Sequence, residues 1–352
     1  MSASPDDLDR LEELLRRMVL IRLTEQYVAK RYPEQAMKCP THLCVGQEGI
    51  AAAFGVASGP ADVFLGSYRS HGHYLAKGGS LRPLFAELLG RATGCSAGLG
   101  GSMHVVDEGA GFLGSSAIVG GTVPIAAGVA FGFRRRREPR VAVVFFGDAA
   151  LEEGVVYETV NFAVLHALPL VLVCENNGLA INTPLGVRSA STRLHGRFAS
   201  LGLAGESVPG SDPLALLHAA RRALESARQG SPAFVEAPVT RFASHVGHAL
   251  SGPVDAWSEA PETAAGACPI ARAARDLVAA KRLSLAQLEA LRGETQAVVE
   301  AAYAAALADP PAQPRSLERA SLAGARLASL PRGAAAAAPG EGVDPSRLVN
   351  PF

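Results

Sequence analysis

The chain has 352 residues, enough for one large α/β domain or two small ones. With 48% apolar and 19% charged residues, its composition is that of a globular protein rather than a disordered one. The 33 basic side chains balance 33 acidic ones, which argues against a nucleic-acid-binding protein with a basic face. Five cysteines without a Cys-x-x-Cys pair favour reduced thiols over a disulfide framework or a zinc site. We therefore expect a cytoplasmic protein.

The sequence predicts neither a secretory signal nor a membrane span. Residues 1–9 carry acidic side chains, whereas a secretory signal begins with a basic segment that is followed by an apolar one. Residues 109–133 carry no charge and precede four arginines at 134–137, which we expect to be solvated. Seven glycines and Pro124 make residues 109–133 a buried, glycine-rich segment rather than a span.

In chain order, the first predicted element is an amphipathic helix over residues 6–30, which Ser4-Pro5-Asp6 would start. Residues 31–110 contain short helical runs broken by glycine-rich turns. Residues 118–133 indicate the end of a strand, a turn and a helix of small residues.

The clearest pattern is a βαβ unit over residues 141–178. Residues 141–146 are six apolar side chains followed by Gly147-Asp148, which is typical of a strand buried on both faces. A helix is predicted over residues 152–167 and a second buried strand over 170–174. These two strands should be parallel and joined by a right-handed crossover.

Further along, residues 213–229 predict a helix, residues 233–237 a third strand, and residues 269–308 one or two alanine-rich helices. We expect an α/β fold with a mostly parallel, doubly wound sheet flanked by helices. Residues 1–308 would form a single domain, and the Pro/Ala-rich residues 309–352 a flexible tail.

Polar residues follow both strands of the βαβ unit. Asp148 follows the first strand, and Asn176 and Asn177 follow the second. Ligands bind beyond the carboxyl ends of parallel strands, and carboxylate and amide oxygens, completed by phosphate oxygens, suit Mg²⁺. Gly147 and Gly178 allow the backbone to approach a ligand closely. The unit therefore predicts a magnesium–diphosphate site, although each motif taken alone also suits an ordinary turn.

Residues 147–154, Leu168-Pro169 and residues 174–177 together resemble the thiamine diphosphate motif, which is Gly-Asp-Gly, a helix and Asn-Asn. Over about residues 10–300 the chain is similar to the E1 α subunits of 2-oxo acid dehydrogenases, which act on pyruvate, branched-chain 2-oxo acids or acetoin. Five further segments match that family in order: residues 42–48, 68–73, 100–104 and 118–120, and Thr240-Arg241 with His245.

This resemblance implies a thiamine diphosphate-binding fold and a role for each matching residue. Asp148 and Asn177 would bind Mg²⁺ through side-chain oxygens, and Leu179 through its backbone carbonyl. The diphosphate would lie against the motif that opens at Gly147, where it would be held by Tyr68, Arg69 and the backbone N–H groups of Ala149 and Ala150.

The same resemblance assigns the reaction centre. The carbonyl of Val119 would accept a hydrogen bond from the 4′-amino group of the cofactor. His42 and His245 would line the centre, with His71 nearby, as proton donors or oxyanion stabilisers.

Some residues have competing interpretations. Ala149 replaces the usual third glycine, which is tolerable unless the position needs a positive φ. His71 and His73 form a His-x-His pair, but without a third ligand a metal site is the weaker interpretation. Glu48 is expected to cap a helix rather than to transfer protons.

The resemblance implies an E1 α subunit that decarboxylates a 2-oxo acid, or cleaves acetoin, and transfers the acyl group to a lipoyl carrier. The chain has room for the diphosphate-binding half of such an enzyme only, since each half takes roughly 150–200 residues. A β subunit would supply the activating glutamate in an α₂β₂ heterotetramer, and a lipoyl-bearing E2 acyltransferase would accept the acyl group. The alternatives are a carboligase or transketolase-like subunit and a cofactor-free scaffold.

Overall fold

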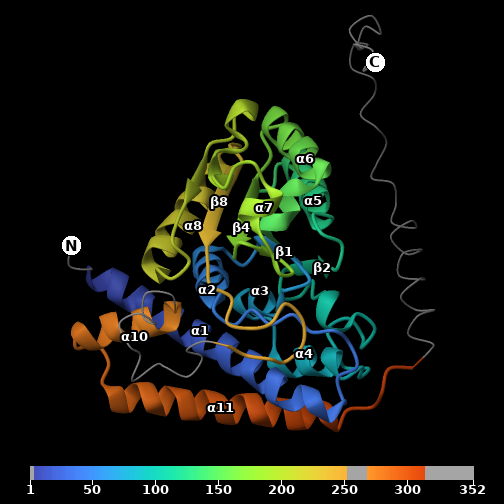
Figure 1. The fold of residues 1–352 in the computed structure, drawn as a ribbon, viewed down its shortest axis with the longest axis vertical. Helices are drawn as coiled ribbons and strands as arrows, with labels where there is room; N and C mark the ends of the chain where they lie inside the picture. Colours follow the sequence, from blue (N-terminus) through green and yellow to red (C-terminus); the bar gives the residue numbers. More distant parts are fainter. Residues whose placement is uncertain (1–3, 252–267, 314–352) are drawn as a thin grey trace, which may run out of the picture. The chain divides into compact units, whose positions relative to one another are not determined.

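The structure is a computed structural model that describes residues 4–251 and 268–313. Its centre is a six-stranded parallel sheet in the order β2–β1–β3–β4–β8–β7 (Figure 1). Strand order reverses between β1 and β3, which is where open α/β sheets bind ligands. The strands are β1 (Val63–Ser67), β2 (Phe112–Ser116), β3 (Ala142–Gly147), β4 (Leu170–Asn176), β7 (Gly205–Ser207) and β8 (Ala233–Pro238).

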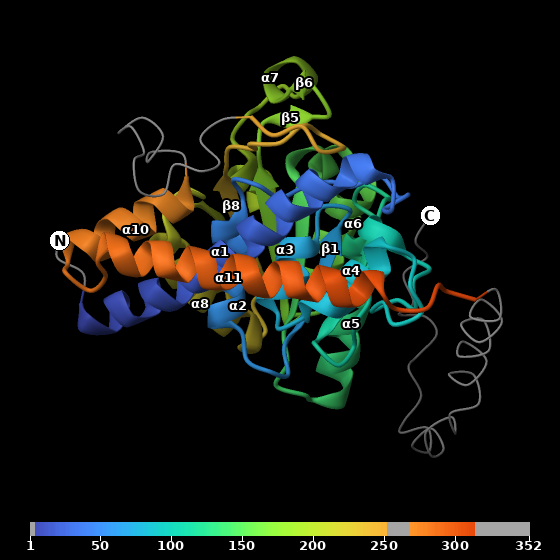
Figure 2. The same cartoon turned by 90° about the horizontal axis from the view of Figure 1, so that it is seen from below.

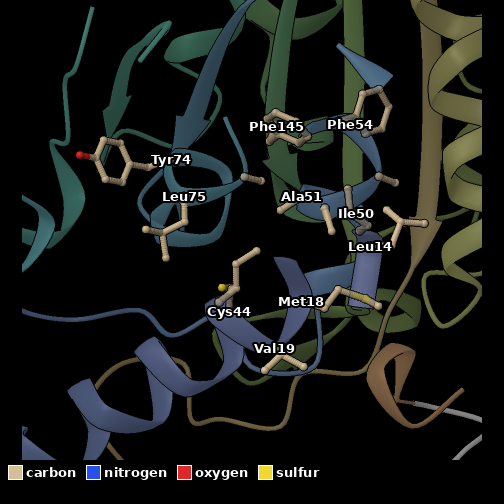
Figure 3. Packing of buried hydrophobic residues seen from close by; sticks show 14 of the residues in the cluster. Leu14, Met18, Val19, Cys44, Ile50, Ala51, Phe54, Tyr74, Leu75 and Phe145 are labelled. Atoms are coloured by element: carbon tan, nitrogen blue, oxygen red, sulfur yellow. The ribbon is translucent and has the colours of Figure 1, made fainter. Parts of the chain in front are cut away.

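Helices cover both faces of this sheet, which confirms the predicted doubly wound α/β fold. One face carries α5 (Thr122–Arg136) and α6 (Gly154–Leu165), and the other carries α2 (Glu48–Ala57) and α8 (Pro213–Arg228) (Figure 1). Successive side chains of β3 alternate between the two cores, as the pleat requires. Phe145 packs edge-on against Phe54 of α2 in the first core, as Figure 3 shows.

Further helices pack around the α2 side of the sheet. They are α1 (Pro5–Arg31), α3 (His71–Ala76), α4 (Leu81–Leu88), α10 (Pro269–Ala279) and α11 (Leu285–Leu307). Helix α11 runs beside α1 and α4 (Figure 2). Ser4 starts α1 through a capping box, in which its hydroxyl accepts a hydrogen bond from the Asp7 N–H at 3.1 Å. The helices predicted at both ends of the domain are therefore confirmed.

The predicted βαβ unit is confirmed, with one shift in its boundaries. Strands β3 and β4 are parallel neighbours in which Val143 lies opposite Val171. Helix α6 begins at Gly154 and not at Glu152, because Asp148–Glu152 form a short 3₁₀ turn instead.

Residues 109–133 are not the uniformly buried segment that we expected. Only one side of α5 packs on the sheet, so Ile125 on the other side is exposed, and Ile118 on the loop before it is 71% exposed. The arginines at 134–136 form the last turn of α5, where cations suit the helix dipole. Among the residues that the structure describes, no helix has the length and apolarity needed to cross a membrane.

Residues up to Ala312 belong to one compact unit. Past the expected domain boundary at residue 308, Asp309 still forms an ion pair with Arg82 and accepts a hydrogen bond from Thr93. The rest of the expected tail, residues 314–352, lies outside the described residues, so its flexibility stays a prediction. The five cysteines are all free thiols, as their number and spacing predicted.

Candidate active site

The carboxyl edge of the sheet brings together residues that are far apart in the sequence. Tyr68 and Arg69 follow β1, Asp148 follows β3, and Asn177 follows β4. They line a cleft of about 30 Å³, with room for little more than water. The lining residues are Gln47, Ser67, Tyr68, Arg69, Gly147, Asp148, Ala149, Glu175, Asn177, Leu179, Arg241 and His245. Parallel strand ends thus converge as the βαβ pattern predicted.

Asp148 is the buried carboxylate of this cleft, with 1% of its surface exposed. Burial raises the pKa of Asp148, although the charge of Arg188 beside it opposes that shift. A cation beside such a carboxylate stabilises its charged form. The neighbouring Ala149 does not adopt a positive φ, so its methyl group fits where the family motif has glycine.

Asn177 lies across the cleft at the end of β4. Its Oδ1 accepts a hydrogen bond from the Leu179 N–H at 3.1 Å, and its Nδ2 donates to Gln47 Oε1 at 3.4 Å. These contacts fix the amide so that its oxygen faces the backbone that leads into Leu179. Glu175, on β4, instead contacts His73 Nε2 at 3.0 Å.

Two arginines give the cleft a positive wall. Arg69 donates hydrogen bonds to the carbonyl oxygens of Leu43 and His245, the latter at 3.1 Å. Arg241 donates to the carbonyl oxygens of Ala243 and Ile181 at 3.0 and 3.2 Å. Burial lowers the pKa of both guanidinium groups, but an arginine remains charged near neutral pH.

His42, Tyr68 and His245 form a cluster of rings beside Arg69. Ring centroids lie 4.4 Å apart for His42 and Tyr68 and 5.1 Å apart for the two histidines. Burial and then the Arg69 charge lower the pKa of His42 to about 3, and the same two causes lower the pKa of His245. Both imidazoles are therefore neutral at pH 7. Their Nδ1 atoms are buried without a hydrogen-bond partner among the described residues, which leaves two polar atoms free for a ligand.

His71 lies behind this cluster, fully buried. Its Nδ1 is 2.6 Å from Glu25 Oε1 and its Nε2 is 2.8 Å from Ser102 Oγ, so both ring nitrogens have partners. His73 faces Glu175 instead, so the His-x-His pair does not share a metal position. No cluster of three or more His, Cys, Asp or Glu side chains suited to a metal occurs in the described part of the chain.

Two of the predicted site residues, Ala150 and Val119, do not line the cleft. Ala150 is buried inside the 3₁₀ turn that Asp148 begins, and Val119 lies exposed on the loop between β2 and α5. Glu48 begins α2 and accepts hydrogen bonds from the Gly46 N–H at 3.0 and 3.1 Å and from Arg22. Glu48 therefore holds the turn before α2 and does not cap the helix as we expected, because the N-cap is Gln47 and α2 has no side-chain capping hydrogen bond.

Five residues of the site had no role in the sequence prediction: Gln47, Ser67, Glu175, Arg188 and Arg241. Three of them belong to segments that match the family, so their neighbours could have indicated them. Arg188 carries no such signal, because only the tertiary structure brings it to Asp148 and Glu152.

Comparison with known proteins identifies the family. The model of the dehydrogenase E1 component family matches residues 16–315. The pyruvate dehydrogenase E1 component subunit alpha of Rhizobium meliloti (strain 1021) is 38% identical over 249 residues, 70% of each chain. The alpha subunit of the acetoin:2,6-dichlorophenolindophenol oxidoreductase of Bacillus subtilis (strain 168) is 36% identical over 233 residues, 66% of this chain and 70% of that one. A chloroplastic pyruvate dehydrogenase E1 subunit alpha-3 of Arabidopsis thaliana is 34% identical over 307 residues, 85% of this chain and 71% of that one.

The fold, the cleft and these comparisons define the α subunit of a thiamine diphosphate-dependent 2-oxo acid dehydrogenase. The chain belongs to the dehydrogenase E1 component family. This membership confirms the predicted oxidoreductase class and implies thiamine diphosphate as the cofactor and a β subunit as the partner. The relatives support this function and not the carboligase or transketolase-like alternative.

Proposed function

We propose that this chain binds thiamine diphosphate with Mg²⁺ at the carboxyl edge of β1, β3 and β4. Together with a β subunit, in an α₂β₂ heterotetramer, it decarboxylates a 2-oxo acid such as pyruvate, or cleaves acetoin, and passes the acyl group to the lipoyl group of an E2 acyltransferase. The main observation behind this proposal is the buried Asp148 facing Asn177 across the ends of two neighbouring parallel strands. The free thiols of the chain are consistent with a cytoplasmic location.

In this proposal the metal ligands are Asp148 and Asn177 through side-chain oxygens and Leu179 through its carbonyl. All three are hard oxygen donors, which Mg²⁺ prefers. The desolvated carboxylate of Asp148 gains most from a bound cation, because burial disfavours its charge. Asn177 already binds the Leu179 N–H, so the two residues are held next to each other.

The diphosphate is assigned to Tyr68, Arg69 and the backbone N–H groups of Ala149 and Ala150, next to Gly147. Arg69 supports this assignment because its guanidinium is buried and fixed by two carbonyl groups, so little side-chain entropy remains to be lost on binding.

Thiamine diphosphate supplies a nucleophilic carbon and an electron sink for decarboxylation. Around it, neutral His42 and His245 can donate a proton from one ring nitrogen and accept one at the other. Their low pKa values make them donors through a neutral N–H rather than as imidazolium groups. His71 would act indirectly, since Glu25 binds both His71 and the backbone N–H of Cys44, two residues from His42. Val119 remains the proposed acceptor for the 4′-amino group, and the β subunit the proposed source of the activating glutamate.

The test is calorimetric titration of thiamine diphosphate, with and without Mg²⁺, into the chain purified together with its β subunit. We expect metal-dependent binding that Asp148→Asn abolishes and that Asp276→Asn, the same change at a half-buried position on α10, preserves. Turnover of 2-oxo acids and acetoin with an artificial electron acceptor then ranks the substrates. Absence of cofactor binding in the unsubstituted complex would refute the proposal and favour the scaffold alternative.

A further inference from the structure

Arg188 occupies the carboxylate side of the proposed metal site. It ends α7 (Leu185–Arg188), which follows a hairpin of β5 (Leu179–Ala180) and β6 (Thr183–Pro184), and these three elements lie together at the upper end of Figure 2. The guanidinium forms ion pairs with both Asp148 and Glu152, and the side chain is 10% exposed. Its Nε also donates a hydrogen bond to the Thr183 carbonyl at 3.3 Å, so the guanidinium has three partners.

This ion pair supplies the positive charge that a buried carboxylate needs. Without the guanidinium of Arg188, Asp148 would be an uncompensated buried anion, which is strongly unfavourable. A divalent ion and a guanidinium on the same carboxylate would repel each other, because both are positively charged and water screens buried charges only weakly. The cleft measures only about 30 Å³ beside Asp148. Arg188 is the side chain whose departure would free the Asp148 oxygens.

We propose that Arg188 is an internal counter-ion that holds the Asp148 carboxylate in the metal-free chain and is displaced when Mg²⁺ and diphosphate bind. The inference rests on the proposed function for the position of the metal. Only molecules in which Arg188 has left Asp148 can bind the metal, so the apparent affinity is reduced by the fraction in that state. If Arg188 is bound nine-tenths of the time, this reduction is about tenfold.

The displacement reaches beyond α7. The Leu185 N–H donates to the Gly178 carbonyl at 2.8 Å, so α7 is tied to the backbone next to Leu179. Arg241 donates to the Ile181 carbonyl between β5 and β6, and Arg241 belongs to the loop that carries His245. Movement of Arg188 away from Asp148 therefore shifts a segment that contacts both the metal side and the histidine side of the cleft. Arg188 is a positioning residue and not a catalytic one.

The test uses Arg188→Gln, with Arg193→Gln as its matched control, because Arg193 is exposed on the same segment. For each variant, in complex with the β subunit, we would titrate Mg²⁺ calorimetrically with excess thiamine diphosphate and measure the metal-free melting midpoint. Arg188→Gln should lower both the half-saturating Mg²⁺ concentration, by about tenfold, and the metal-free melting midpoint. Glu152→Gln, which removes one of the two ion pairs, should lower the half-saturating concentration by a smaller factor in the same direction.

A purely structural arginine would give a different pattern, since its loss would weaken metal binding and stability together. Unchanged or weaker metal binding by Arg188→Gln would overturn the counter-ion proposal while leaving the proposed function intact. If the unsubstituted complex bound no metal at all, the proposed function would fail and the counter-ion proposal with it. Arg193→Gln should change neither quantity, and an equal effect of both substitutions would refute a specific role for Arg188.

Discussion

The buried ion pair between Arg22 and Glu48 offers the sharpest test of how the core positions the site. Both side chains are fully buried. Glu48 binds Arg22 Nε at 2.5 Å and Nη2 at 2.9 Å, while its oxygens also accept the Gly46 N–H. Although burial opposes it, the Glu48 charge raises the pKa of Arg22. One carboxylate thus fixes α1 to the backbone turn that leads from His42 to Gln47.

Glu48→Gln keeps the size of the side chain and removes its charge. Breaking one side of a buried pair costs about 3–5 kcal/mol, because the remaining charge is left uncompensated. An unfolding entropy of about 2.1 cal/mol/K per residue over roughly 300 packed residues gives about 0.6 kcal/mol/K, so the melting midpoint should fall by about 5–8 °C.

The assay is thermal unfolding followed by circular dichroism, at one protein concentration and without cofactor. Glu289→Gln is the control, because the side chain of Glu289 is 68% exposed and its loss should matter by less than about 0.5 kcal/mol. If the two variants melt within a degree of each other, the charge of Glu48 is not what holds this turn.

The remaining predictions concern the loop and the ring cluster of the cleft. Gly46→Ala should destabilise the protein and weaken cofactor binding, because Gly46 has φ +95° and a Cβ there would lie 2.2 Å from the Thr240 carbonyl oxygen. Gly128→Ala, on an open helix face, should instead stabilise by about 0.5–1 kcal/mol in chemical denaturation. Stability should fall as the pH drops below about 6.5 toward 3, because the unfolded imidazole of His42 then binds a proton that the folded one, with a pKa of about 3, does not. His42→Asn should flatten that slope in pH-dependent unfolding, and an unchanged slope would assign it to other groups.

Elements with a strong local pattern were predictable from the sequence. Strands β3 and β4 consist largely of apolar residues, many of them β-branched or aromatic, so their burial follows from composition. Strands β1 and β7 were missed, because Val-Phe-Leu-Gly-Ser and Gly-Glu-Ser are too short and too rich in small or polar residues to indicate a strand. They become strands by pairing with β3 and β8, and that pairing is a tertiary effect. Helix α2 is one of the short helical runs expected within residues 31–110.

The residues of the site likewise differ in whether a local sequence pattern could predict them. Asp148 and Asn177 could be predicted from physical reasoning, because both follow buried strands of one βαβ unit. His42 and His245 lie on loops 203 residues apart, so only the family resemblance linked them. Arg188 matched neither the strand pattern nor the family segments. Its position depends on how the hairpin of β5 and β6 folds back over the end of β3.

Arg69 connects these parts of the cleft. By binding the carbonyl groups of Leu43 and His245, it holds the two histidine loops against each other, and its charge helps to keep both imidazoles neutral. An anion bound against Arg69 would offset that charge and so raise the pKa values of His42 and His245. Occupation of the proposed diphosphate position would therefore do more than retain the cofactor. It would bring the two imidazoles closer to the pH at which they can exchange protons with a substrate, at the moment when the cofactor is in place.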